Sequence, residues 1–301
     1  MRKPSRGLVI AGGLAAIVIL GAGAGVYSIS SASGGRSLAR VVSEAASTPD
    51  LKVEIGAIDG VLSAAPSVRD IVISDRDGPW LKIDRVAAKW SRLSLLGMKL
   101  DVDKIDIGEV DVLRAPVASA EKKPEQKSGG GTFPPKLPIG VRLGELALAR
   151  LVLAEPVLNA AAALSIRAGA ELTGSAASVR LEAQRLDAPG SIGVDAAYAA
   201  QGDRLRLKFA ASEPGDGLIA RIAKIPGLPP VEASIDGEGP LDAFVAKIAA
   251  KAGEAGAEGA ARITREGAAR RFDIDLAARL ADLLPQDLAA PLADVTKLDA
   301  A

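Results

Sequence analysis

Apolar and polar residues alternate along most of the chain, and this period of two predicts β-strands. A first strand is expected from Leu51, with a turn at Gly56–Gly60, and clearer strands at Val68–Ser74 and Leu81–Trp90. Further alternating segments lie at 164–167, 171–173, 177–184, 191–199, 204–210 and 231–236, and a hairpin is expected from 260–264 and 271–276. Turn residues separate these segments at short intervals, which predicts an antiparallel meander.

A few short segments have helical spacing instead. Ser37 can cap an amphipathic helix that ends before Pro49, and Asp216–Ile225 is expected to form another, stopped by Pro226. A single helical turn is expected at 91–98 and a helical stretch at 280–292, and the segment 241–252 fits either a helix or a strand. A further strand is expected to begin near Val295.

One hydrophobic pattern occurs twice with the spacing three, two, three, two. A proline follows each copy, Pro116 after the first and Pro156 after the second. A step of two keeps side chains on one face of a strand, whereas a step of three implies a bulge or a sharp twist. The two copies therefore predict strongly twisted strands, and they are Val102, Ile105, Ile107, Val110 and Val112, then Leu143, Leu146, Leu148, Leu151 and Leu153.

The segment between the two copies is polar and rich in Pro and Gly. Residues 118–136 read ASAEKKPEQKSGGGTFPPK after Val117, a composition typical of a disordered loop. Because the hydrophobic pattern resumes beyond it, the segment is interpreted as an insertion between neighbouring strands and not as a linker between domains.

A run of twenty uncharged residues, Gly7–Val26, stands near the N-terminus. It is long enough to cross a bilayer core of about 30 Å as a helix. Arg2, Lys3 and Arg6 precede it, which predicts a cytoplasmic N-terminus and an exported remainder. The alternative is a cleaved signal peptide, with small residues at Ser28–Ala32 for the peptidase.

Composition removes several functional classes. The formal net charge is zero, so electrostatic binding of nucleic acid has no support. Cysteine and histidine are both absent, which removes thiolate chemistry, the commonest general base and the usual zinc ligands. No phosphate-loop, dinucleotide or serine-hydrolase motif occurs, and no enzyme activity, cofactor or metal is predicted. With only 3% aromatic residues, the apolar surface is spread over small side chains, which suits an extended sheet.

Acidic residues crowd the first copy of the repeat, at Asp101, Asp103, Asp106, Glu109 and Asp111, and Asp75, Asp77 and Gly78 resemble part of a calcium loop. The first group alternates with apolar residues, as on the solvated face of a half-buried strand. The second lacks the remaining ligands of such a loop and is interpreted as a turn. Trp80 and Trp90 could bind a ligand but are more typical of a sheet core or edge.

The apolar faces of the repeated strands are the candidate site. If one face of a single coiled sheet is uncovered, it forms a hydrophobic groove, and a large apolar surface usually binds a partner or a lipid. The alternative is that a second layer covers this face. The candidate lining residues are Val102, Ile105, Ile107, Val110, Val112, Leu143, Leu146, Leu148, Leu151 and Leu153.

The chain resembles the N-terminal region of TamB proteins, the inner-membrane subunits of the translocation and assembly module, within the AsmA-like superfamily. The resemblance rests on residues 37–116, above all on Ile58–Gly60, Asp75–Trp80 and Ile83–Asp84, and on Gly217–Asp242. It implies a single-pass inner-membrane protein with a long periplasmic β-groove that supports assembly of outer-membrane and autotransporter proteins and carries phospholipid between membranes. A TamA-like outer-membrane barrel is the implied partner, through a C-terminal part that these residues lack.

Together these observations predict a mainly β protein, with a transmembrane helix followed by a twisted antiparallel sheet and a few short amphipathic helices. The expected parts are 1–33 with the anchor, 34–117 with the first strands, the loop 118–136, and a continuing sheet at 137–301 that is truncated at its C-terminus. Two functions remain open: a groove that shelters phospholipid acyl chains or unfolded outer-membrane strands, and a scaffold whose sheet edge receives such strands by β-augmentation. A charge at Leu148 is expected to abolish the first and spare the second.

Overall fold

The structure is a computed structural model that describes residues 35–48, 50–60, 63, 65–91, 93–97, 99–117, 140–267, 269–279 and 296–300. The expected anchor at Gly7–Val26, the loop at 118–136 and the helical stretch at 280–292 lie outside these ranges. Within the described ranges, no helix has the length and apolar character that crossing a membrane requires.

The protein is mainly β, as the alternating pattern predicts. Its strands are β1 (Lys52–Asp59), β2 (Ser67–Asp75), β3 (Gly78–Ser91), β4 (Lys99–Val112), β5 (Gly140–Leu153), β6 (Ala162–Leu172), β7 (Ala176–Arg185), β8 (Ser191–Ala199), β9 (Arg204–Glu213), β10 (Val231–Pro240), β11 (Ala243–Ala252), β12 (Ala255–Glu266), β13 (Ala269–Arg279) and β14 (Thr296–Ala300). The helices are α2 (Gly35–Ala46), the 3₁₀ turn η1 (Leu93–Gly97), α3 (Glu155–Leu158) and α4 (Leu218–Ala223).

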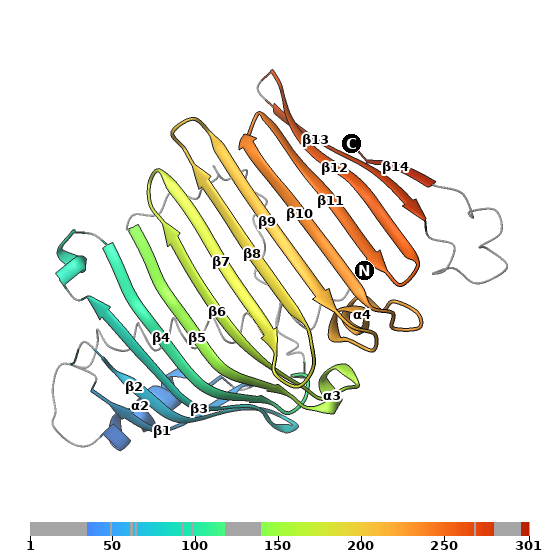
Figure 1. Cartoon of the computed structure of the whole chain (residues 1–301). Helices are drawn as coiled ribbons and strands as arrows, with labels where there is room; N and C mark the ends of the chain where they lie inside the picture. The colour runs from blue at the N-terminus through green and yellow to red at the C-terminus, as the bar shows by residue number, and fades with distance from the viewer. Residues whose placement is uncertain are drawn as a thin grey trace. The chain divides into compact units, whose positions relative to one another are not determined.

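All fourteen strands belong to one sheet, and their spatial order is their order in the sequence (Figure 1). Neighbours from β1 to β3 and from β6 to β14 pair antiparallel. Most strands are joined by tight turns, as at Asp75–Gly78, where the N–H of Asp77 donates to Oδ1 of Asp75 at 2.9 Å. The expected turn at Asp75–Gly78 is confirmed.

Strands β4 and β5 run in the same direction, which the expectation of an antiparallel sheet did not include. Arg142 pairs with Asp101 at 2.7 Å and Arg150 pairs with Glu109 at 3.8 Å, so the contacts advance together along both strands. The N–H of Ala154 then donates to the carbonyl of Val112 at 2.9 Å. Parallel neighbours need a long crossover connection, so the residues between Val112 and Gly140 are a topological requirement of this pair.

Two other strand predictions differ from the structure. The expected turn at Gly56–Gly60 is wrong, because β1 continues to Asp59 and the chain turns at Gly60, whose φ is 63°. The segments 164–167 and 171–173 form the single strand β6, since Gly169 does not interrupt the pairing with β7. The ambiguous segment 241–252 forms strand β11.

The chain divides into two compact units. Unit 1 holds Met1–Trp90, Ile105–Lys127 and Leu148–Ala161, and unit 2 holds Ser91–Lys104, Ser128–Ala147 and Ala162–Ala301. In unit 1 the apolar side of the sheet is closely packed, with Leu81, Val110 and Val112 at 0% exposure. Ala39 of α2 and Val157 of α3 are buried with them, so short helices complete this core.

Strands β1, β2 and β3 of unit 1 each contain two apolar residues that are three positions apart, and these three-residue steps lie side by side. The step Ile55–Ile58 of β1 is opposite Val68–Ile71 of β2, which is opposite Ile83–Val86 of β3. The pairing register is therefore the same before and after the step, and no strand carries an extra residue there. Asp70 absorbs the irregularity with a left-handed φ of 55°, whereas the register shift that marks a bulge lies at Ile73/Ser74.

Helix α2 protects the outer edge of the sheet in unit 1. The N–H of Ile55 donates to Oγ of Ser43 at 2.9 Å, and the N–H of Val53 donates to Oγ of Ser47 at 3.0 Å. An edge strand otherwise presents unpaired backbone groups to other chains. Two serine hydroxyls thus occupy donors of β1 that a further strand would need.

Candidate functional site

Unit 2 contains a sheet with two chemically distinct faces. The strand register places apolar residues directly opposite one another across eight strands. We call this side of β6–β13 the apolar face. Its middle, the central row, consists of Ala168, Leu181, Val194, Phe209, Ile235, Ile248, Gly259 and Leu276.

The rows beside the central row are also apolar but smaller. On one side the register aligns Ala211, Ala233, Ala250, Ala257 and Ala278, and on the other it aligns Leu207, Gly237, Ala246, Ala261 and Ile274. Seven strand intervals of roughly 4.8 Å give the face a width of about 34 Å across the strands. The result is a broad apolar surface of mostly aliphatic side chains.

Exposure distinguishes this face from the core of unit 1. Phe209, Ile235 and Ile248 are half-buried, although they occupy the middle of the sheet. Closer to its margins, Val179 is 43%, Ile274 40% and Phe272 62% exposed. Packing against a second layer would remove such side chains from solvent, as it does for Val110 and Val112. The central row and these margins of the apolar face are therefore accessible, whereas Ala211, Ala246 and Ala278 in the flanking rows are buried.

The opposite face of unit 2 is charged, with signs that alternate from strand to strand. Arg180, Asp195, Lys208, Asp236 and Lys247 lie opposite one another in that order on β7–β11. Contacts include Arg180 to Asp195 at 3.1 Å and Lys208 to Asp236 at 3.8 Å. If one strand slipped by one residue against its neighbour, its apolar side chains would move to the charged face and its charged side chains to the apolar face. The patterns on the two faces therefore favour the same register.

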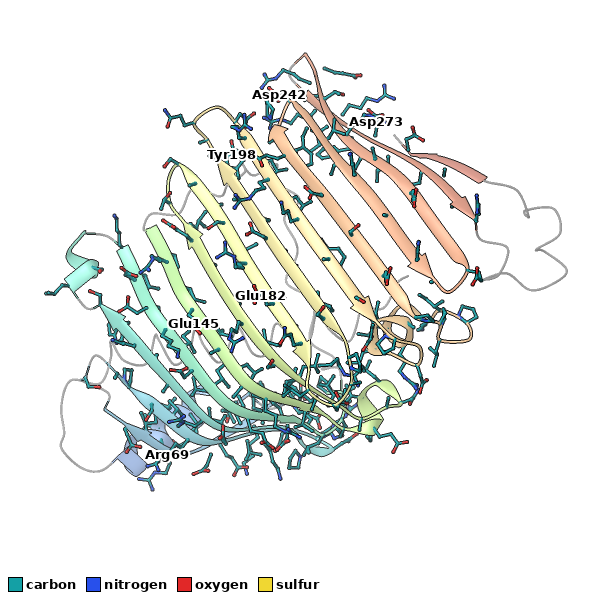
Figure 2. The ribbon with its side chains drawn as sticks, viewed as in Figure 1. Arg69, Glu145, Glu182, Tyr198, Asp242 and Asp273 are labelled. Carbon is teal, nitrogen blue, oxygen red and sulfur yellow. The ribbon has the colours of Figure 1, made fainter. Side chains whose placement is uncertain are left out.

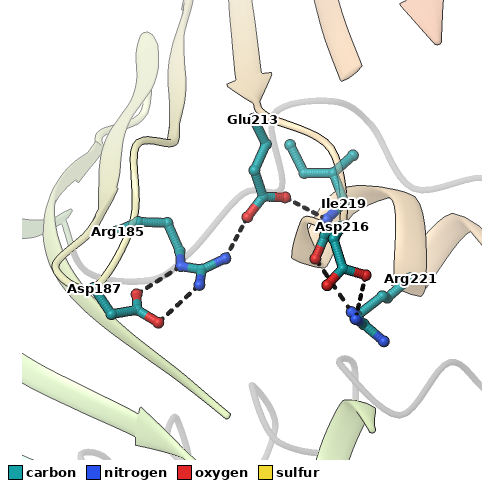
Figure 3. A network of polar contacts seen from close by, with 6 residues as sticks. All are labelled: Arg185, Asp187, Glu213, Asp216, Ile219 and Arg221. Atoms are coloured by element: carbon teal, nitrogen blue, oxygen red, sulfur yellow. Dashed lines mark hydrogen bonds and ion pairs between the residues drawn. The ribbon is translucent and has the colours of Figure 1, made fainter. Parts of the chain in front are cut away.

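One end of the apolar face is closed by a buried ion pair (Figure 3). Nη1 of Arg185 lies 2.6 Å from Oε1 of Glu213, and their side chains are only 11% and 4% exposed. The other carboxylate oxygen of Glu213 accepts a hydrogen bond from the N–H of Ile219 at 2.6 Å, which holds the first turn of α4. The carboxylate of Asp187 accepts hydrogen bonds from Nε and Nη2 of Arg185, each at 2.8 Å.

Electrostatics at this end favour the charged forms. The hydrogen bond from Arg185 lowers the pKa of the Asp187 carboxyl to about 2, against the opposing effect of burial. The same contact raises the pKa of Arg185. The charges at this end of the face are therefore paired inside the protein.

The opposite end of the apolar face carries exposed charges. Tyr198 and Asp242 mark it in Figure 2. The hydroxyl of Tyr198 donates to Oδ1 of Asp203 at 2.7 Å, and Arg270 connects Asp203 to Asp242 at 2.8 and 2.9 Å. Arg265 contacts the second oxygen of Asp242 at 2.5 Å. Hydrogen bonds from Arg265 and then Arg270 lower the pKa of the Asp242 carboxyl.

The ten residues predicted to line a groove occupy both units. Those in unit 1 are buried in its core, at exposures between 0% and 8%, and they are Ile105, Ile107, Val110, Val112, Leu148, Leu151 and Leu153. Val102, Leu143 and Leu146 belong to unit 2 and are half-buried. A ligand could reach the buried group only if packed side chains moved. The accessible apolar surface lies on β6–β13, where the prediction named no residue.

The acidic residues of β4 belong to ion pairs or to its polar side. Arg142 contacts Asp101 at 2.7 Å and Asp103 at 3.6 Å. Within the ranges described above, no group of three or more acidic, His or Cys residues could hold a metal ion. Trp80 is 4% exposed and its indole Nε1 is buried without a described partner, whereas Trp90 is half-buried at the end of β3.

Comparison with known proteins identifies no relative. No family model matches the chain, and no curated protein or solved structure matches it significantly. The resemblance to TamB proteins consequently stays a prediction from the residues. The arrangement itself, an accessible apolar face with paired charges at one end and exposed charges at the other, is suited to hold an amphiphile.

Proposed function

We propose that this chain is a non-enzymatic envelope protein that shelters the acyl chains of phospholipids on the apolar face of β6–β13. The accessible central row carries this proposal. An apolar face of this size is unfavourable in water, and burial of each acyl CH₂ stabilises a complex by about 0.8 kcal/mol. A modest length of acyl chain on this face would suffice for binding without any specific hydrogen bond.

The proposed setting follows the resemblance to TamB proteins. An uncleaved anchor at Gly7–Val26 would place the sheet in the periplasm, where a continuous apolar face can conduct lipid between membranes. Partners would then be the inner membrane, phospholipid and a TamA-like outer-membrane barrel. The aliphatic character of the central row supports passage of chains of differing length, because it offers no polar group that fixes one position.

A charge on the central row tests the proposal. The full chain would be purified gently in a mild detergent and examined by native mass spectrometry for bound phospholipid. Phe209→Glu should remove the lipid, because a carboxylate in the middle of the face opposes burial of an acyl chain. Its neighbour Ala210 is exposed on the charged face, opposite Gly193 and Ser234, so Ala210→Glu is the matched control and should retain the lipid. A lipid-free parent, or a Phe209→Glu variant that still holds lipid, would contradict the proposal.

A charge at Leu148, the change expected from the sequence to separate the two functions, is not suitable for this experiment. Leu148 is 4% exposed in the core of unit 1, so a charge there would destabilise the fold whatever the protein binds. Phe209 is half-buried and can accept a polar group with less damage. The choice of position thus separates loss of binding from loss of structure.

The second candidate function is a scaffold that receives extended strands at a sheet edge. At the β1 edge, Ser43 and Ser47 already occupy backbone donors. At the other edge, β14 pairs with Ile274–Ala278 of β13, and residues Ala269–Asp273 have no partner on that side among the described residues. An added strand of a client protein would therefore pair with this stretch of β13, next to β14, and not with β1. Binding of an extended peptide that Phe209→Glu leaves intact would favour this candidate.

A further inference from the structure

At the charged end of the apolar face, two arginines lie directly opposite each other on neighbouring strands. Arg265 of β12 lies directly opposite Arg270 of β13, next along the strands from the pair Ile263 and Phe272. Both arginines therefore stand on the apolar side of the sheet. Like charges in directly opposed positions destabilise a pair of strands, so this placement needs a compensating contact.

Asp242 supplies that contact and orients both guanidinium groups. Its two oxygens accept Nε of Arg265 and Nε of Arg270, and Nη2 of Arg270 is held by Asp203. In the contacts among the described residues, both Nη atoms of Arg265 and Nη1 of Arg270 stay unused. Arg265, held through Nε alone, presents its two Nη groups as a fixed fork that matches two oxygens of a phosphate, and Nη1 of Arg270 adds a further donor beside it.

This cluster is accessible and continuous with the apolar face. Arg265 is 56% and Arg270 37% exposed in their side chains, and Phe272 beside them is 62% exposed. Phe244, Ile263 and Phe272 form the adjoining row. Phe244 is 4% exposed, whereas Ile263 is half-buried and Phe272 exposed, so an acyl chain that lies along Ile263 and Phe272 would end at the arginines. The other end of the face offers no comparable group, because Arg185 is 11% exposed and satisfied by Asp187 and Glu213.

We propose that Arg265 and Arg270, oriented by Asp242, bind the phosphate group of a phospholipid whose acyl chains lie on the apolar face. The lipid is thereby held with one direction, its headgroup beside the β12–β13 turn and its chains toward α4. The inference rests on the proposed function and extends it from acyl chains in general to lipids with a phosphate group.

Three probes separate the headgroup from the chains. The full chain in a mild detergent would be titrated with dioleoylphosphatidylglycerol, with dioleoylglycerol, which has the same chains and no phosphate, and with inorganic phosphate as a competitor. Native mass spectrometry reports the occupancy of each lipid. The parent should prefer the phospholipid, and Arg265→Gln with Arg270→Gln should lower its occupancy by about tenfold or more while leaving dioleoylglycerol unchanged.

Two further variants control for fold and for charge. Arg262 lies on the same strand but on the charged face, where it pairs with Asp275. The Arg262→Gln variant should therefore bind both lipids like the parent. Arg265→Lys with Arg270→Lys keeps the charge and loses the fork, so its phospholipid occupancy should fall between parent and glutamine variant. Circular dichroism of each variant should match the parent.

The outcomes distinguish this inference from the proposed function. A parent that binds both lipids equally, or a glutamine variant with undiminished phospholipid binding, would overturn the headgroup site alone. Inorganic phosphate that displaces the phospholipid at equal concentration would assign the arginines to free phosphate instead. A parent that binds neither lipid would overturn the proposed function itself.

Discussion

Gly108 of β4 faces the carboxylate of Asp84 on β3 so closely that no side chain fits at position 108. A Cβ built there would collide with both oxygens of Asp84. That carboxylate cannot easily turn away, because Oδ1 accepts the N–H of Glu109 at 2.7 Å and the N–H of Arg85 at 2.5 Å. The packing of β4 against β3 beside the aligned three-residue steps therefore requires Gly108 opposite Asp84.

Gly108→Ala should destabilise the protein by about 1–3 kcal/mol, the usual cost of overpacking a filled site. The free energy of unfolding from chemical denaturation measures this. Gly193→Ala is the matched control, because residue 193 also lies within a strand and its Cβ would meet no atom within 4 Å. Equal stabilities of the two variants would show that Asp84 yields without cost.

Breaking the buried pair at the closed end should be more costly. Glu213→Gln removes the charge opposite Arg185 while keeping the shape, and loss of one partner in a buried pair costs roughly 3 kcal/mol. Glu232→Gln, on the exposed side of the adjacent strand β10, is the control and should change stability by less than about 1 kcal/mol. A Glu213→Gln effect no larger than that of the control would contradict a stabilising role.

Acid should weaken the same end of the sheet. The folded pKa of Asp187 is lowered from 3.8 to about 2 by Arg185, so its contribution is fully present above pH 3.8. It is lost as the pH falls from 3.8 toward 2, because the unfolded state then binds the proton more readily. Asp187→Asn should flatten the dependence of unfolding free energy on pH within that window. Parallel curves for parent and variant would rule out this linkage.

Local patterns predicted most of the strands, and the reason is visible in unit 2. There each strand has one apolar and one charged face, so a period of two in the sequence corresponds directly to the two sides of the sheet. The stretch Ser191–Ala199 was predicted with the observed bounds of β8. Gly56 misled the prediction because its lack of a side chain serves close approach to Asp70 and not a turn.

The direction of β4 and β5 and the position of the accessible face were harder to predict. The spacing of Val102–Val112 and Leu143–Leu153 runs in the same order in both copies, so all five positions align only if the two strands are parallel, and the prediction of an antiparallel sheet did not use this signal. Whether the apolar side of these strands is covered depends on α2 and α3, whose packing partners lie elsewhere in the chain. For this reason the strongest apolar repeat largely marks the core of unit 1, and the weaker alternation of Leu181 to Leu276 marks the accessible face.

Arg265 and Arg270 could have been noticed from the sequence as two arginines flanking a hairpin turn. Their common face and their shared carboxylate depend on the register of three strands. Asp242 precedes β11, far from both in the sequence, and only the pairing of β11 with β12 brings it to them.

The strictly sequential order of the strands also has a consequence for how the protein unfolds. Each strand pairs only with its neighbours in the sequence, so the sheet behaves as a linear array of coupled elements. Such an array can lose strands from an end while the remainder stays folded, and hydrogen exchange would report graded protection in place of one cooperative transition. The crossover between β4 and β5 closes the longest loop between neighbouring strands for which both ends are described, so joining these two strands is expected to be the slow step of assembly.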